Sequence, residues 1–289
     1  MVFTGAVMFS AKAVLIKLAY RHPVDAISLL TLRMLMALPF YIAVTLFLSA
    51  RKKQSRLDRK DYLSVVILGV LGYYLASFFD FYGLKFVTAS LERLILFVYP
   101  TFVVLILAMV FKNKISGLQI LAILMTYAGI IVIVANDLNM DDQKDVWLGG
   151  GLILLSALTF AIYLVGSGEI IPRIGSIRFT AMAMSVSAVC VIIHYLIGHP
   201  AAGIFVFNRE VYLLALTIAL LSTVLPSFLL SEGILRIGSS NASIIGGIGP
   251  VSTIVLAYFF LDERITWLQI IGTLIVISGV LLISLKNKK

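Results

Sequence analysis

Seven charged side chains lie inside long apolar runs of this 289-residue chain: Lys12, Lys17, Arg33, Asp80, Glu92, Arg93 and Glu232. A charge in apolar surroundings is costly, so it usually faces a cavity, an ion partner or a ligand. Four of the seven are positive and three are negative, which leaves one positive charge without a partner. The set therefore indicates an interior site for a solute that carries an anionic group such as a carboxylate.

The composition places these runs in a membrane. Hydrophobic residues make up 61% of the chain and charged residues 13%, with a mean hydropathy of +1.08, whereas soluble domains carry about 25% charged residues. A water-facing surface cannot cover so much apolar side chain, which excludes soluble enzymes, nucleic-acid modules and disordered regulators. Hydropathy predicts an all-α integral membrane protein with ten spanning helices, at 2–19, 24–49, 62–84, 88–110, 117–135, 147–168, 178–198, 212–236, 241–261 and 266–285.

The placement of Lys and Arg residues predicts the orientation in the cell membrane. If both termini are cytoplasmic, the external segments hold Arg21, Lys85, Lys144, Arg209 and Arg264. The cytoplasmic segments then hold a larger set: Arg51, Lys52, Lys53, Arg56, Arg59, Lys60, Lys112, Lys114, Arg173, Arg178, Arg236, Lys286, Lys288 and Lys289. Positive residues favour the cytoplasmic side, so membrane insertion accounts for the net charge of +9. No nucleic-acid partner is needed to explain that charge.

The chain aligns with itself at an offset of 150 residues, where Tyr62–Val134 matches Tyr212–Ser284 without a gap. The informative identical pairs are Ser77/Ser227, Gly83/Gly233, Pro100/Pro250, Gln119/Gln269 and Gly129/Gly279. Each copy contains five predicted spans, an odd number, so the second copy enters the membrane the opposite way up. Inverted repeats around a midplane site are a signature of secondary transporters, although duplication kept for packing alone stays an alternative.

Local sequence segments agree with this organisation. They are FSAKAVLIKLAY (9–20), ISLLTLRMLMALPF (27–40), SLERLILFVYPTFVVLILA (90–108) and the segment 241–282, which contains IIGGIGP and LDERITWLQI. In these segments the chain resembles the EamA family of the drug/metabolite transporter superfamily, with five-helix units at 1–136 and 147–286. The resemblance implies two inverted repeats around a central cavity, and export or exchange of small metabolites by alternating access. One departure is Asn113, at a position where the second copy has Glu263 and the family often carries Glu.

Lys12 and Arg33 are expected to lie deepest of the interior charges. We expect them to bind an anionic part of the substrate, with Asp80 or Glu92 balancing them when the site is empty, because unpartnered buried cations are costly. An acid freed from its cation could then take up a proton, which would couple transport to proton movement. A purely structural pair with Asp80 stays an alternative, and Glu92 could instead complement the N-terminus of its helix. Arg93 projects about 100° away from Glu92, so one of the two could be structural.

The remaining candidates also have open alternatives. Glu232 is expected near the inner end of the eighth span, and Lys17 could extend to the membrane interface. Tyr99 is placed for a cavity wall, although aromatic residues also suit ordinary packing. Pro100 and Pro250 are equivalent in the two copies and are expected to interrupt helices beside the cavity.

The sequence carries no signature of an enzyme, a cofactor site or a metal site. It has no phosphate-binding glycine loop for ATP, and His22, His194 and His199 lack the spacing of metal ligands. The single Cys190 excludes an intramolecular disulfide. The expected partners are a small-molecule metabolite, such as an amino acid, and the lipid bilayer. A channel or a non-transporting membrane protein is the alternative function, and the oligomeric state is left open.

Single cysteines in a Cys190-free variant test the predicted topology. Residues introduced into Ala50–Asp61 and at the C-terminus should react with an impermeant thiol reagent only from the cytoplasmic side. Residues in Asn136–Val146 should react only from outside, because the positive residues concentrate in the other segments. Labelling of the 136–146 loop from the cytoplasmic side alone would refute this orientation.

Overall fold

The computed structural model describes residues 1–50, 57–111, 145–246, 248–263 and 265–285, together with isolated positions between 117 and 131. This part of the chain consists of helices and short connections and contains no strand. Most of the predicted fifth span at 117–135, most of the 136–146 loop and the C-terminal residues 286–289 lie outside the described residues. So do residues 51–56, in the first basic loop.

Within the described residues, seven helical segments are long and apolar enough to cross a membrane. Each coincides with a segment predicted from hydropathy, which confirms the all-α membrane class, while the count of ten spans stays a prediction. Four of these segments are single helices: α1 (Val2–Ala19), α2 (Ala26–Ala50), α8 (Val146–Ile174) and α9 (Ser176–Gly198). Two shorter apolar helices, α12 (Ile248–Leu261) and α13 (Trp267–Leu285), coincide with the last two predicted spans.

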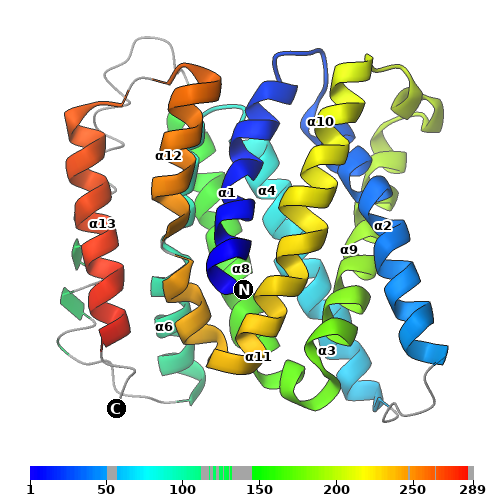
Figure 1. The fold of residues 1–289 in the computed structure, drawn as a ribbon, viewed down its shortest axis with the longest axis horizontal. Helices are drawn as coiled ribbons and strands as arrows, with labels where there is room; N and C mark the ends of the chain where they lie inside the picture. The colour runs from blue at the N-terminus through cyan, green and yellow to red at the C-terminus, as the bar shows by residue number, and fades with distance from the viewer. Residues whose placement is uncertain are drawn as a thin grey trace.

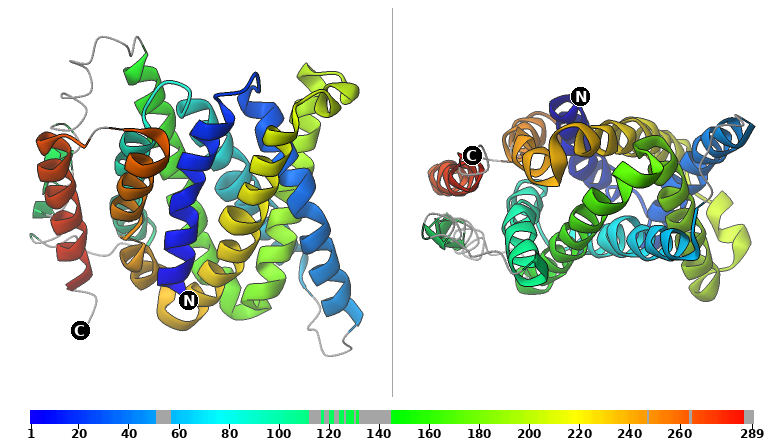
Figure 2. Two further views of the ribbon diagram at one scale, coloured as in Figure 1. Left: turned by 45° about the horizontal axis from the view of Figure 1, so that its top comes forward. Right: turned by 90° about the horizontal axis from the view of Figure 1, so that it is seen from below.

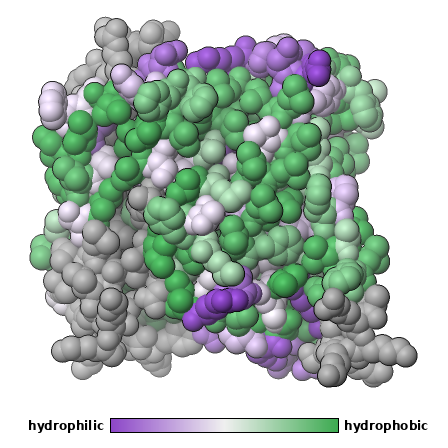
Figure 3. Space-filling model, viewed as in Figure 1, coloured by the Kyte–Doolittle hydropathy of each residue, from purple (hydrophilic) through white to green (hydrophobic). Residues whose placement is uncertain are grey.

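The helices lie side by side along a common direction and form a bundle (Figures 1 and 2). On the face drawn in Figure 3, apolar residues form a broad belt, and hydrophilic residues gather along its upper and lower rims. Large apolar side chains that are more than half exposed include Leu46, Ile197 and Phe259. Exposure of large apolar side chains around the belt matches a surface that faces the hydrocarbon core of a bilayer.

The third and eighth spans each contain a π-helical segment. The third consists of α3 (Arg59–Gly69), η1 (Val70–Leu75) and α4 (Ala76–Gly83). The eighth consists of α10 (Arg209–Ala219), η3 (Leu220–Val224) and α11 (Leu225–Ile245), preceded by the 3-10 helix η2 (Ala201–Phe205). The two π-helical segments begin 150 residues apart, at Val70 and Leu220. π-Helical turns are rare and concentrate at functional sites.

The fourth predicted span is broken into α5 (Ala89–Leu96) and α6 (Tyr99–Phe111). In the second half, Gly238 takes a left-handed φ of 78° inside α11, so the residues after it form a separate short helical piece before α12. The helix interruptions predicted at Pro100 and Pro250 lie next to these two breaks, since α5 ends four residues before Pro100 and α11 ends five residues before Pro250. Each proline lies in the first turn of the helix that follows the break, where the missing N–H leaves no helical hydrogen bond unmade.

Close contacts hold the third span against the second half of the chain. A Cβ atom on Gly69 would lie 2.6 Å from the backbone oxygen of Ala183 in α9. A Cβ atom on Gly72 would lie 2.2 Å from Cγ of Tyr163 in α8. Small residues allow membrane helices to approach this closely, so both glycines set the distance between neighbouring helices.

Gly69→Ala is expected to lower the stability of the protein by about 1–3 kcal/mol, because a backbone carbonyl cannot yield as a flexible side chain can. Gly151→Ala in α8 is the matched control, since a Cβ atom there meets no atom of the described residues within 4 Å. The control should be neutral or stabilising by up to about 1 kcal/mol. Thermal unfolding in detergent measures both, and equal melting temperatures for the two variants would contradict the packing described here.

Candidate functional site

A buried ion pair lies at the centre of the candidate site. Lys12 of α1 and Asp80 of α4 approach to 2.6 Å between Nζ and Oδ2. The Asp80 side chain is 1% exposed and that of Lys12 is 12% exposed. Sequence reasoning offered Asp80 as a partner for either of two deep cations, and the structure pairs it with Lys12.

Arg33 of α2 lies close to this pair but contacts neutral groups. Its Nη2 donates a hydrogen bond to Ser77 Oγ at 3.0 Å. Its guanidinium carbon lies 4.8 Å from the centroid of the Phe81 ring, within the range of a cation–π contact. The residue is 3% exposed, and its Nε has no hydrogen-bond partner among the described residues. Arg33 is therefore a buried cation with unused donors.

The short helix α5, all of whose residues are buried, supplies two further charges. Arg93 Nη2 donates to Ser10 Oγ of α1 at 3.2 Å, and its Nε has no partner within the described part of the chain. Glu92 is 0% exposed, and its carboxyl group lies beside that of Asp80. We call these five residues the charge cluster, which carries one net positive charge when every member is ionised: Lys12, Arg33, Asp80, Glu92 and Arg93.

The N-terminus of α5 is capped by groups other than Glu92. Thr88 Oγ1 accepts a hydrogen bond from the Leu91 N–H at 3.1 Å. Glu263, from the connection between α12 and α13, accepts from the Ala89 N–H at 2.8 Å. Its other oxygen accepts from the N–H and the hydroxyl of Ser90, at 3.2 and 2.6 Å. These groups, rather than Glu92, accept the described hydrogen bonds at the start of α5, while Glu92 lies in the first turn, where a negative charge can complement the helix N-terminus.

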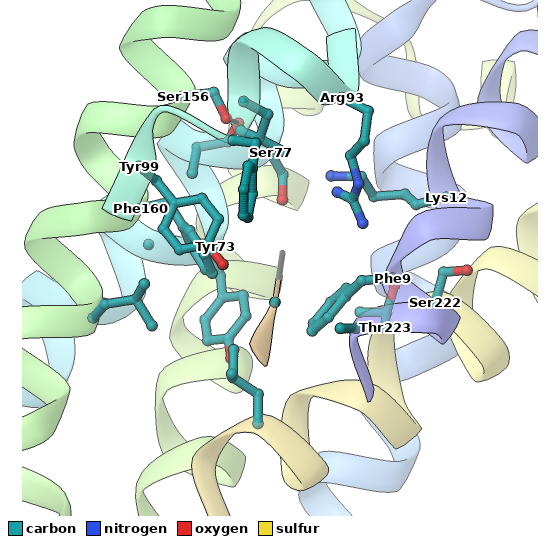
Figure 4. Close-up of a pocket in the computed structure, with 18 of the residues that line it drawn as sticks. Phe9, Lys12, Tyr73, Ser77, Arg93, Tyr99, Ser156, Phe160, Ser222 and Thr223 are labelled. Carbon is teal, nitrogen blue, oxygen red and sulfur yellow. Dashed lines mark hydrogen bonds between the residues drawn. The ribbon is translucent and has the colours of Figure 1, made fainter. Parts of the chain in front are cut away.

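A cavity of about 110 Å³ opens beside the charge cluster (Figure 4). Its cationic side is formed by Lys12, Arg33 and Arg93, and the nitrogen-bearing ends of Lys12 and Arg93 point toward the same region in the close-up. Across from them lie the rings of Tyr73, Tyr99 and Phe160. Tyr99 and Phe160 meet edge to face with ring centroids 5.2 Å apart.

The two π-helical segments meet at this cavity. Gly72 and Tyr73 of η1 line it, and so do Ser222 and Thr223 of η3. The two residue pairs are 150 positions apart, the offset found by self-alignment. Equivalent positions of the two halves therefore both contribute to the cavity lining.

Several other predicted site residues lie elsewhere. Glu232 accepts hydrogen bonds from Ser176 Oγ at 2.6 Å and from Arg236 Nε at 2.8 Å, so it is engaged outside the cavity lining. The acidic neighbour of Lys17 is Glu263. Pro100 and Pro250 do not line the cavity, but Tyr99, which precedes Pro100 in the chain, does line it.

Sequence reasoning missed several wall residues, chiefly Ser77, Tyr73 and Phe160. The spans are apolar all round, so periodicity could not tell their inward face from their lipid face. One available signal was the match of Ser77 with Ser227, because polar residues kept in equivalent spans suggest an interior role. Among the described residues, no group of three His, Cys, Asp or Glu side chains could hold a metal ion.

Known proteins align with the chain over nearly its whole length. The EamA-like transporter family matches residues 1–135 and 147–285. Uncharacterized transporter YcbK of Bacillus subtilis (strain 168) is 31% identical, covering 99% of this chain and 93% of its own. An uncharacterized transporter of Archaeoglobus fulgidus is 22% identical, covering 97% of this chain and 94% of its own. A protein of known crystal structure shares the fold, with a TM-score of 0.72 at 16% identity, over 100% of this chain and 97% of that one.

The family match covers both halves of the chain, and the relatives align across almost their full lengths. The described helices supply the multiple apolar segments that a multi-pass membrane protein requires. The chain therefore belongs to the EamA-like transporter family.

Proposed function

We propose that this protein is a secondary transporter that moves small organic metabolites across the cell membrane by alternating access. It is not an enzyme, and it inserts with both termini in the cytoplasm. Residues 1–136 and 147–286 form two inverted five-helix repeats, which together make ten spans. Lys12, Arg33 and Arg93 bind the anionic part of the substrate.

The observation that carries this proposal is the cavity beside the charge cluster. A membrane protein with a purely structural interior would fill this space with apolar side chains, because buried charge is costly. Here three cations, two of them with unused donors, line an open space instead. An internal site that excludes lipid and presents charge is what a carrier of polar solutes needs.

Three pairs of features support the inverted repeats. Val70 and Leu220 begin the two π-helical segments at the 150-residue offset. Another pair consists of close-packing glycines. A Cβ atom on Gly83 would lie 2.8 Å from Ile153 near the start of α8, and one on Gly233 would lie 2.1 Å from Val2 at the start of α1. In each half, the third helix thus packs tightly against the first helix of the other half, as a two-fold axis in the membrane plane would require.

The remaining pair of features is the break in the fourth span of each half, which also bears on alternating access. The cavity lining extends from Lys12 to Val2, at the start of α1, and includes Gly246 between α11 and α12. The opposite end is held by the contact of Glu263 with α5. In the proposed orientation this is a conformation whose cavity extends toward the cytoplasm while the external end is closed.

Uptake of a metabolite panel into proteoliposomes, with and without a proton gradient, tests the function. A carrier gives saturable uptake and accelerated exchange when the same solute is present inside. A channel gives flux that rises linearly with concentration and shows no exchange. Absence of saturation for every solute that crosses would refute the carrier mechanism.

Arg33→Ala should weaken substrate binding about 10–100-fold, because hydrogen bonds to charged groups contribute about 1.5–3 kcal/mol. Substrate affinity is measured by exchange kinetics in proteoliposomes. Arg173→Gln is the control, since Arg173 is an exposed cation that pairs with Asp61 at 3.1 Å. Affinity that is unchanged in a folded Arg33→Ala protein would remove Arg33 from the binding site.

Glu92→Gln is expected to retain substrate exchange but lose accumulation driven by a proton gradient. The physical reason is that Glu92 shares a buried environment with Asp80, so its proton uptake responds to the cations that substrate engages. If Glu92 served only to complement the helix N-terminus, the variant would lose about 0.3–1 kcal/mol of stability and keep its coupling. Proton-driven accumulation that persists in both Glu92→Gln and Asp80→Asn would end the coupling hypothesis.

A further inference from the structure

The cavity wall has two chemically different sides, of which one presents cations and the other presents aromatic rings. The described lining residues include no Asp or Glu side chain. The two acids of the charge cluster lie behind the wall, where Asp80 is engaged by Lys12.

We propose that the substrate is an organic monoanion that joins a carboxylate to an aromatic body and carries no ammonium group. Aryl-substituted 2-oxo, 2-hydroxy and acetic acids have this chemistry. This inference rests on the proposed transport function and narrows it, because it replaces the amino acids expected from the sequence by their deaminated counterparts.

The cationic side is suited to one carboxylate. Arg33 and Arg93 are 3% and 9% exposed, and neither forms an ion pair with a carboxylate of the described chain. Each donates from Nη2 to a serine hydroxyl, while each Nε stays without a partner. A guanidinium group binds a carboxylate through a fork of paired N–H donors. A single negative charge on the ligand also balances the net positive charge that the cluster carries when every member is ionised.

The opposite side is suited to a ring. Tyr99 stands edge to face with Phe160, whose ring stacks on Tyr163 with centroids 5.8 Å apart. Tyr73 meets Tyr163 with centroids 4.8 Å apart and an interplanar angle of 60°. Neighbouring rings therefore hold one another in place, and a further ring can join them by offset stacking or an edge-to-face contact.

An amino acid would bring an ammonium group into the same space. The described wall offers that group hydroxyl oxygens, backbone oxygens and the faces of aromatic rings but no carboxylate, and it places three cations nearby that repel it. Like charges that lie close together in a low-dielectric interior cost free energy. An ammonium group would also lose its hydration on entering, with no carboxylate to replace it. The wall therefore discriminates against zwitterions that have the same ring and the same carboxylate.

The test compares matched ligands on the purified wild-type protein by isothermal titration calorimetry in detergent. Phenylpyruvate and phenylalanine share a phenyl group, a three-carbon chain and a carboxylate, and differ at carbon 2. Phenylpyruvate is expected to bind at least about tenfold more tightly than phenylalanine, a difference of about 1.4 kcal/mol. Pyruvate, which lacks the ring, should also bind at least about tenfold more weakly than phenylpyruvate.

Equal affinity for phenylpyruvate and phenylalanine would overturn the inference, and so would no detectable binding of phenylpyruvate. Equal affinity for pyruvate and phenylpyruvate would overturn the aromatic part. Arg93→Gln should weaken phenylpyruvate binding at least about tenfold, while Arg173→Gln should leave it unchanged. Proteoliposome uptake then separates the two proposals: phenylpyruvate that binds but is never transported leaves the ligand class intact and refutes the transport function.

Discussion

The Lys12–Asp80 pair joins α1 to α4 within a bundle that carries a broad apolar belt on the face drawn in Figure 3. Neither charge can be left alone there, because removing one partner of a buried pair costs about 3–5 kcal/mol. The pair therefore fixes the relative position of the two helices. It also draws the other members of the charge cluster together, since Arg33 and Arg93 reach the same region from α2 and α5. Helix order, cavity position and charge balance all depend on this one constraint.

Much of the fold could be predicted from the sequence. Hydropathy predicts α1 at 2–19, where the structure has Val2–Ala19, because a membrane span must be long and apolar whatever its neighbours are. Pro100 predicted an interruption in the fourth span, and α5 ends four residues before it. The residues of the break could not be predicted, since Phe97 and Val98 are apolar and proline suits the first turn of a helix as well as a kink.

The candidate site was predictable to the extent that charge reveals it. Lys12, Arg33, Asp80 and Arg93 were identified because ionisable groups inside apolar runs demand an explanation. Glu232 is also an ionisable residue inside an apolar run. However, it pairs with Arg236 one helical turn away and does not line the cavity. Of the aromatic wall, Tyr99 was expected from its place beside Pro100, whereas Tyr73 and Phe160 were not predictable, because rings are frequent on every side of these helices. Which ring faces inward depends on helix rotation, and rotation is set by contacts between distant segments.

The cap that Glu263 provides for α5 comes from the opposite half of the chain, and this arrangement has a consequence for the evolution of the family. In the proposed transport cycle, separation of Glu263 from α5 would leave the N–H groups of Ala89 and Ser90 without this acceptor, so the strength of this one contact would contribute to the free energy of opening. Each change of about 1.4 kcal/mol in that free energy alters the ratio of open to closed molecules tenfold. In the proposed cycle, substitutions at this position would therefore change how fast a family member cycles while its cavity wall stays the same, so that turnover and selectivity would diverge independently.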